Sequence, residues 1–236
     1  MANRVRSIRY IEIFTGIFLI LAVIGALFAM LSDFSIVTPN STLQEDMSGL
    51  SDNIEGLRIS TLVRLGCGVL LLLLLPFLML TFSYHTKVYH YITGFLILLI
   101  SAYYFLSAWA GFRMISFIRT LPTDFMAGTE SEQETALLFS VRQIQNLIMV
   151  GRMTIGLFLI LFAFSKIKAH RIPLFSTVLL LLSGPLIIFF SWYNPEQLIL
   201  TIAMACAAIG VVVLGLRLIN RGLLWLPLKK NDHKDH

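Results

Sequence analysis

Six arginines stand apart from the other basic residues of this chain, because they fall on the side of the expected helices that carries no lysine. They are Arg58, Arg64, Arg113, Arg119, Arg142 and Arg152. A guanidinium group is a planar fork of donors that suits a carboxylate or a phosphate, and lysine cannot reproduce that fork. An arginine near the centre of a bilayer costs about 2.5–3.5 kcal/mol to insert and needs a partner or water. Arg64 and Arg152 lie inside apolar segments and Arg113 lies at the outer end of one, so these three are the candidate anion-binding residues.

Helical spacing places other residues beside these arginines. Residues three or four apart share a helix face. One such stripe holds Arg142, Gln145, Met149, Arg152 and Gly156, a second holds Thr61, Arg64 and Gly68, and a third holds Tyr103, Ala110 and Arg113. The sequence therefore predicts an outward-facing pocket lined by Arg64, Arg113, Arg152, Gln145 and Tyr103.

A purely structural explanation of the same arginines stands beside this one. Arg58, Arg119 and Arg142 sit at expected helix ends, where they can pair with loop acids or lipid phosphates. The three inner arginines can snorkel to the interface, or bond to backbone carbonyls, Tyr103 or Tyr104 within a bundle. Both explanations are compatible with the spacing.

Three histidines offer a different chemistry. His85, His90 and His170 are expected at one end of the helices, with Glu12 one turn inside the first span. Three histidines and a carboxylate can form a catalytic metal site, which would make the protein a membrane-embedded hydrolase. The histidines lack helical ligand spacing and no nucleophile or phosphate-loop motif occurs, so we expect no catalytic residue, no metal and no cofactor. Glu12 is expected to pair with Arg9 or with a neighbouring helix end.

The elements that must carry these residues are membrane-spanning helices. Of the 236 residues, 57% are hydrophobic and 13% are charged, and the mean hydropathy is +0.83. A spanning helix needs roughly 20 mainly apolar residues. Six stretches qualify, at about 11–31, 59–82, 91–112, 143–164, 173–192 and 198–216, with Pro173 as the first helical residue of the fifth. We therefore expect an all-α, polytopic transmembrane bundle of six helices that forms a single domain over 1–236.

The distribution of lysine predicts the orientation of this bundle. Lys87, Lys166, Lys168 and the lysines of the tail fall on the same side as the arginines that precede the first span. Because basic residues near helix ends mark the cytoplasmic side, we expect cytoplasmic N- and C-termini and a multi-pass location in the cell membrane. The expected partners are the lipid bilayer and a small anionic ligand or lipid headgroup, and no nucleic acid.

Two internal patterns bear on the architecture. If the bundle consists of two inverted halves of three helices, Pro76 and Gly184-Pro185 fall in corresponding helices, and 15–21 resembles 155–161. Interrupted helices at matched positions indicate a transporter site. Small residues four apart allow helices to approach closely, within a monomer or between monomers of an oligomer. These pairs are Ala22 with Ala26, Gly25 with Ala29, Ala203 with Ala207 and Cys206 with Gly210.

Short motifs carry a resemblance to a known family. Gly111-Phe112-Arg113-Met114-Ile115 and Gly151-Arg152, together with an acidic loop after the first span, resemble an uncharacterised bacterial family of six-helix integral membrane proteins, the domain of unknown function 4386 type. The resemblance implies the six-helix fold, draws attention to Arg113 and Arg152, and implies no activity. In that family an acid often follows the third-helix arginine by three positions, and here Ser116 stands there instead.

The function that these residues favour is the binding, or the passage, of a small anion or an anionic lipid headgroup at the arginine-lined pocket. A hydrolase with a histidine site and a non-catalytic membrane partner subunit are the alternatives. An enzyme is the less expected class.

Overall fold

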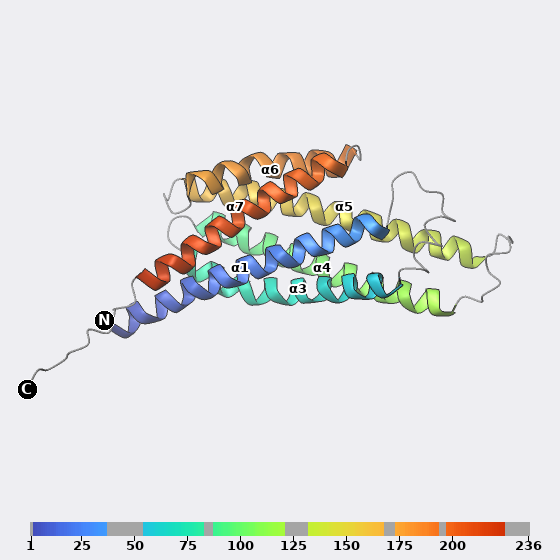
Figure 1. Ribbon diagram of the computed structural model, residues 1–236, viewed down its shortest axis with the longest axis horizontal. Helices are drawn as coiled ribbons and strands as arrows, with labels where there is room; N and C mark the ends of the chain where they lie inside the picture. The colour runs from blue at the N-terminus through green and yellow to red at the C-terminus, as the bar shows by residue number, and fades with distance from the viewer. Residues whose placement is uncertain are drawn as a thin grey trace, which may run out of the picture.

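The computed structural model describes residues 2–36, 54–82, 87–120, 132–167, 173–193 and 197–224. The described residues form six α-helices and match the predicted all-α class. The helices are α1 (Ala2–Ile36), α3 (Ile54–Phe82), α4 (Lys87–Thr120), α5 (Glu132–Ile167), α6 (Leu174–Tyr193) and α7 (Gln197–Leu224) (Figure 1). Each contains a stretch that is long and apolar enough to cross a membrane, as in a multi-pass membrane protein.

The helices are mostly longer than the predicted spans. α5, for example, begins at Glu132, three turns before the apolar stretch that starts near residue 143. Hydropathy detects only the apolar part of a helix, whereas backbone hydrogen bonding continues into its polar ends. Helix α6, by contrast, begins one residue later than predicted. Pro173 precedes the first helical residue, and its carbonyl accepts a hydrogen bond of 3.0 Å from the Thr177 amide, so Pro173 caps the helix instead of opening it.

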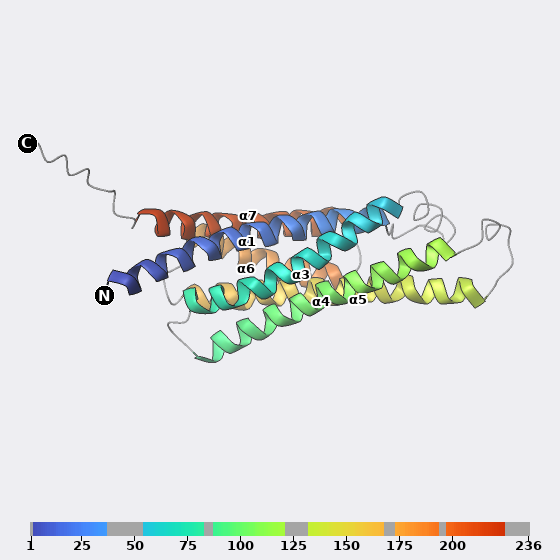
Figure 2. The same cartoon turned by 90° about the horizontal axis from the view of Figure 1, so that it is seen from below.

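The helices pack as one closed ring. Each helix packs against its neighbours in the chain, and α1 packs against α7 to close the ring. Helices α1, α4 and α6 run in one direction and α3, α5 and α7 in the other (Figure 1, Figure 2). The beginning of α1 and the end of α7 lie together at one end of the bundle, the terminal end. We call the opposite end, where α1 ends and α3 begins, the far end.

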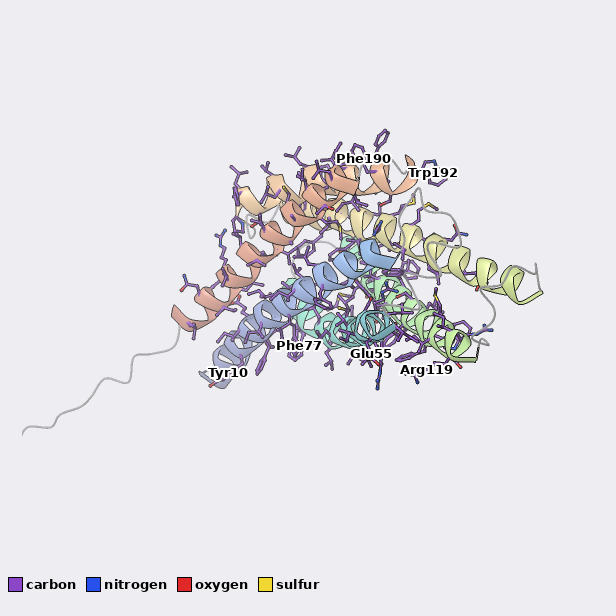
Figure 3. All side chains as sticks on the ribbon, turned by 45° about the vertical axis from the view of Figure 1, so that its right-hand side comes forward. Tyr10, Glu55, Phe77, Arg119, Phe190 and Trp192 are labelled. Atoms are coloured by element: carbon purple, nitrogen blue, oxygen red, sulfur yellow. The ribbon has the colours of Figure 1, made fainter. Side chains whose placement is uncertain are left out.

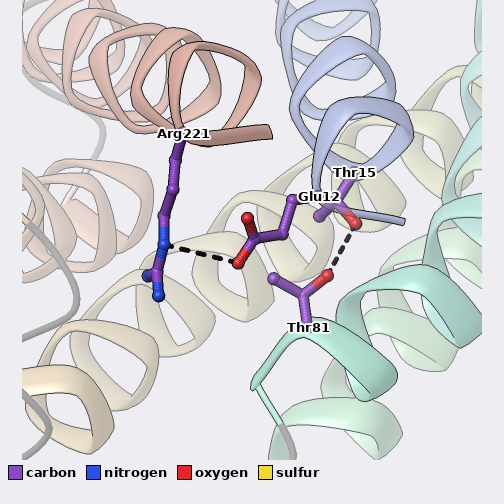
Figure 4. Close-up of polar contacts among 4 residues, drawn as sticks. All are labelled: Glu12, Thr15, Thr81 and Arg221. Atoms are coloured by element: carbon purple, nitrogen blue, oxygen red, sulfur yellow. Dashed lines mark hydrogen bonds and ion pairs between the residues drawn. The ribbon is translucent and has the colours of Figure 1, made fainter. Parts of the chain in front are cut away.

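Polar contacts join three helices at the terminal end. Glu12 of α1 forms an ion pair with Arg221 near the end of α7, with 3.6 Å between Oε1 and Nε (Figure 4). One turn further along α1, the hydroxyls of Thr15 and Thr81 of α3 are hydrogen-bonded at 2.8 Å. The expected pairing of Glu12 with a neighbouring helix end is therefore confirmed.

Two antiparallel helix pairs cross at glycine in the same manner. A Cβ atom on Gly156 of α5 would lie 2.7 Å from the Gly184 carbonyl oxygen of α6, and a Cβ on Gly184 would lie 2.8 Å from that of Gly156. The corresponding distances for Gly16 of α1 and Gly215 of α7 are 2.5 and 2.9 Å. In both pairs, the isoleucine one turn after each glycine lies over the glycine of the partner helix. These isoleucines are Ile160, Ile188, Ile20 and Ile219.

A third antiparallel pair, α3 with α4, crosses in a similar way, with a serine in place of one glycine. The Ser101 hydroxyl of α4 donates a hydrogen bond of 2.9 Å to the Gly68 carbonyl of α3. Phe105, one turn after Ser101, lies over Gly68 as the isoleucines lie over the other glycines. Pairs α3–α4, α5–α6 and α7–α1 therefore all cross closely at small residues. We call Gly68, Ser101, Gly156, Gly184, Gly215 and Gly16 the crossing residues.

This arrangement differs from the two inverted halves considered from sequence. A two-fold axis in the membrane plane would reverse the order of helices around the ring, whereas the chain follows one direction around the whole ring. Helices α3 and α6 also continue through Pro76 and Pro185. The similarity of 15–21 to 155–161 reflects the glycine and isoleucine that α1 and α5 both use at their crossings.

The rows of small residues pack inside the monomer. Ala22, Ala29, Ala203 and Ala207 are buried in the bundle, and Gly25 faces the Cys67 thiol. Large apolar side chains cover the outside of the ring, with Tyr10 toward the terminal end and Trp192 toward the far end, both exposed (Figure 3). Aromatic residues at these levels are typical of membrane interfaces.

Candidate functional site

Helices α3, α4 and α5 bring together two of the three candidate arginines. Arg64 of α3 is only 2% exposed, and Arg152 of α5 is partly buried. The charge of Arg64 interacts with that of Arg152, and both interact with the phenol groups of Tyr103 and Tyr104 of α4. These four residues form what we call the arginine site. Its members Arg64, Arg152 and Tyr103 were all predicted to line the pocket.

Each of the two arginines lies one turn before a helix crossing. Arg64 precedes the crossing residue Gly68 by one helical turn, and Arg152 precedes Gly156 by the same turn. Residues four apart lie on one face of a helix, so each arginine shares the buried face of its crossing glycine. The predicted stripe of Thr61, Arg64 and Gly68 is correct, because all three residues are buried.

The tyrosines are fixed by close packing against α5. A Cβ atom on Gly151 would overlap the ring of Tyr103, so only glycine lets this ring lie on the α5 backbone next to Arg152. The rings of Tyr103 and Tyr104 have centroids 4.9 Å apart, and Tyr104 is buried. Aromatic pairs at this separation attract each other. Tyr103 therefore has a defined position beside both arginines.

Apolar residues enclose the arginine site along the bundle axis. Toward the far end, Leu57, Met114, Ile115 and Ile148 form a cluster from the same three helices. On the other side, Ala29, Cys67 and Ile100 pack around Tyr104. In such a low-dielectric environment, charges act on each other and on a ligand more strongly than in water.

Arg113 does not belong to this site, contrary to the prediction that it faces the interior. Its side chain is exposed, and its guanidinium lies 5.0 Å from the ring centroid of the exposed Trp109. The inward face of α4 passes through Tyr103, Ala110 and Met114, because steps of seven and four return to the same side of a helix. A step of three from Ala110 turns Arg113 away from that face. Arg113 thus shows the cation–π stacking of an arginine on the outer surface.

The remaining arginines and Gln145 do not join the arginine site in the described part of the structure. Arg58 pairs with Glu55 one turn earlier in α3, at 3.7 Å, and both side chains are exposed. Arg119 is exposed near the end of α4 (Figure 3). The side chains of Arg142 and Gln145 fall outside the described residues, so the role predicted for Gln145 stays a prediction.

The histidine alternative is also untested. His85 and His170 lie outside the described residues, as does the side chain of His90. Within the described part of the chain, His, Cys, Asp and Glu side chains form no group that could hold a metal ion. The metal site therefore stays a prediction.

Two members of the site environment were not singled out as site residues from the sequence. The sequence pattern indicates Tyr104 only as a possible hydrogen-bond partner, and Gly151 only as the residue before Arg152. The Gly151-Arg152 pair is a signal that could have pointed to them, because a glycine beside a buried charge leaves room for a neighbouring side chain.

Comparison with known proteins yields no relative for this chain: no family model, no curated protein and no solved structure matches it. The resemblance to the six-helix family thus stays a prediction.

Proposed function

We propose that this protein is a multi-pass protein of the cell membrane that binds a small anion, or the anionic headgroup of a lipid, at the arginine site. One observation carries the proposal. Two guanidinium groups from helices that are not neighbours in the ring, Arg64 and Arg152, come together with two phenol groups inside the bundle. Like charges repel more strongly in a low-dielectric interior, and each also loses hydration on burial. A bound anion offsets both costs, which gives a physical reason to hold the two arginines together.

The donor groups of the site also suit an anion with oxygen acceptors. Each guanidinium offers a fork of N–H groups, and each tyrosine offers one O–H. Hydrogen bonds between charged partners are about twice as strong as neutral ones. A lysine ammonium group carries the same charge but lacks the planar fork of donors. Arginine at positions 64 and 152 therefore favours recognition of an oxyanion.

Thermal unfolding of the purified protein in a neutral detergent tests this proposal. Phosphate, chloride, acetate or phosphatidic acid is added in rising amounts. An anion that binds only the folded state stabilises it by about 2.7 kcal/mol at one hundred times its dissociation constant. We expect at least one of these anions to raise the melting temperature of the wild type by several degrees, and Arg152→Lys to lose most of that shift while it still folds.

Arg58→Lys is the matched control, because Arg58 is an exposed arginine on the same helix as Arg64 and pairs with Glu55. It should keep the full shift. If no anion in the panel stabilises the wild type, or if Arg152→Lys responds like the wild type, the proposal is wrong.

The proposed orientation places both termini in the cytoplasm, because the lysines at the terminal end mark the cytoplasmic side. Single cysteines at Ser48, Thr129 and Asn231 test it, in a background with Cys67 and Cys206 replaced by alanine. In intact cells an impermeant thiol reagent should label positions 48 and 129, and only a permeant reagent should label position 231. Labelling of position 231 by the impermeant reagent would contradict this orientation.

A further inference from the structure

The outer surface of α4 changes in chemical character toward the far end of the bundle. Leu106, Trp109, Arg113 and Ser116 are all exposed, and their spacing of three or four residues places them in one row, which we call the outer row. Along this row an aliphatic side chain is followed by an aromatic one, a cationic one and a hydroxyl. A phospholipid has a matching order, from its acyl chains through its ester groups to its phosphate. Leu106 and Arg113 lie about 10 Å apart along the helix axis, less than one leaflet of a bilayer about 40–45 Å thick.

The guanidinium of Arg113 is held in place by its neighbour in the outer row. It lies over the ring of Trp109, 5.0 Å from the ring centroid. Because α4 runs toward the far end, Trp109 precedes Arg113 on the side of the apolar membrane interior (Figure 1). An arginine that only snorkels would extend away from that interior. Stacking uses the flat face of the guanidinium and leaves the N–H groups at its edge available to a ligand.

The charges of Arg113 and Arg119 are not neutralised by any carboxylate among the described residues. On the adjacent helix α3, Arg58 pairs with Glu55, whereas Arg113 lies over Trp109 without an acidic partner. Arg119 stands in the last turn of α4 and is exposed (Figure 3). Basic side chains near a membrane surface attract anionic lipids. The far end of α4 therefore has an uncompensated positive charge at the place where a lipid headgroup would lie.

We infer that the outer row of α4 binds an anionic phospholipid of the membrane leaflet at the far end, whose phosphate accepts hydrogen bonds from the guanidinium of Arg113 and whose acyl chains lie along Leu106. The indole N–H of Trp109 adds a donor near the ester groups. Arg119, about 9 Å further along the helix axis, attracts the negative charge of the headgroup. This lipid site lies on the outer surface and is separate from the arginine site inside the bundle.

Quenching of tryptophan fluorescence by brominated lipids tests the inference at the lipid site itself. The chain has three tryptophans. Trp109 and Trp192 are exposed, and Trp225 lies outside the described residues. Two single-tryptophan proteins are prepared, one that keeps Trp109 and one that keeps Trp192, with phenylalanine at the other two positions. Each is reconstituted into phosphatidylcholine vesicles that contain rising fractions of brominated phosphatidylglycerol, which is anionic, or of brominated phosphatidylcholine.

The two reporters should differ in their lipid preference. At Trp109 we expect phosphatidylglycerol to bind about fivefold more strongly than phosphatidylcholine, the preference that one arginine near a membrane surface gives. Trp192 should show no preference, because the last turn of α6 contains no basic residue. Arg113→Gln should abolish the preference at Trp109. The Glu55→Gln/Arg58→Gln double variant is the matched control, because it removes an exposed ion pair without changing the net charge, and it should keep the preference.

Three results would overturn the inference. Equal quenching of Trp109 by the two lipids would exclude an anionic lipid site there. The same preference at Trp192 would show a general enrichment of anionic lipid around the protein. A preference that persists in Arg113→Gln, or is lost in the control, would show that Arg113 does not hold the lipid. If Arg113→Gln does not fold in a melt without added lipid, the comparison of the two reporters still decides.

The lipid site and the proposed function fail or stand separately. Arg113 lies outside the arginine site, so Arg113→Gln in the natural sequence should keep the full phosphate-dependent or chloride-dependent shift in melting temperature. Loss of that shift in Arg113→Gln would show that the two sites are not separate and would contradict the inference.

Discussion

Replacing Gly156 with alanine is expected to lower the free energy of unfolding by about 1–3 kcal/mol, the usual cost of forcing extra volume into a packed interior. The new Cβ would lie 2.7 Å from the Gly184 carbonyl oxygen and equally close to Ile188 of α6. Both atoms belong to the packed helix α6, and the carbonyl oxygen is part of its backbone. Helices α5 and α6 must therefore move apart. Close approach at small residues is a main source of attraction between helices in lipid. Chemical denaturation in mixed micelles measures the change.

Gly66→Ala is the matched control for this variant. Gly66 lies on the exposed side of α3, two residues after Arg64, and a Cβ there meets nothing within 4 Å. Because alanine favours a helix by about 0.5–1 kcal/mol over glycine, this substitution should leave stability unchanged or raise it slightly. Equal stabilities for the Gly156 and Gly66 variants would show that the crossing does not hold the bundle together.

Gly151→Ala is expected to damage the arginine site and stability together. The added methyl group overlaps the Tyr103 ring, which must leave the α5 backbone beside Arg152. We expect a loss of about 1–3 kcal/mol in unfolding free energy. We also expect at least a tenfold weaker response to the stabilising anion, because a displaced Tyr103 no longer directs its hydroxyl toward the arginines. Melting curves with and without anion measure both effects.

A double variant separates packing from ligand binding. Tyr103→Leu removes the ring that the methyl group of Gly151→Ala would meet. The double variant should therefore lose less unfolding free energy than the sum of the losses in the two single variants, by about 0.5–3 kcal/mol. Its anion response should stay weak, because the hydroxyl is absent. Purely additive stabilities would show that the methyl group and the ring do not meet.

The six helices and the inward direction of Arg64 and Arg152 could be predicted because both depend on information within one helix. A long apolar stretch reveals a spanning helix, since its backbone must be satisfied within the segment. The spacing of Thr61, Arg64 and Gly68 reveals one face of α3, and the burial of those residues agrees with it. The same reasoning failed for Arg113, because Tyr103 and Ala110 lie at the edge of the buried face of α4, and the step of three from Ala110 leads to the exposed side beside Trp109.

The relation between helices could not be predicted in the same way. The sequence pattern allowed two inverted halves as one possibility, whereas the helix contacts follow the chain around a single ring, with close crossings at Gly16, Gly156 and the other crossing residues. Glycines and isoleucines are common in apolar helices, so their spacing in one helix does not identify the partner helix. The place of Tyr104 in the site likewise depends on how α4 packs between α3 and α5.

Equilibrium binding of radiolabelled phosphate tests the anion-binding claim most directly, because it needs no change in stability to report the ligand. Purified wild-type protein, the Arg64→Lys/Arg152→Lys double variant and Arg58→Lys are dialysed against the same phosphate solutions in a neutral detergent. We expect saturable binding that approaches one phosphate per chain for the wild type and for Arg58→Lys, and at least a hundredfold weaker binding for the double variant. Equal binding to the wild type and the double variant, or no saturable phosphate binding together with no thermal shift from any other anion of the panel, would contradict the assignment of Arg64 and Arg152 as an anion-binding pair.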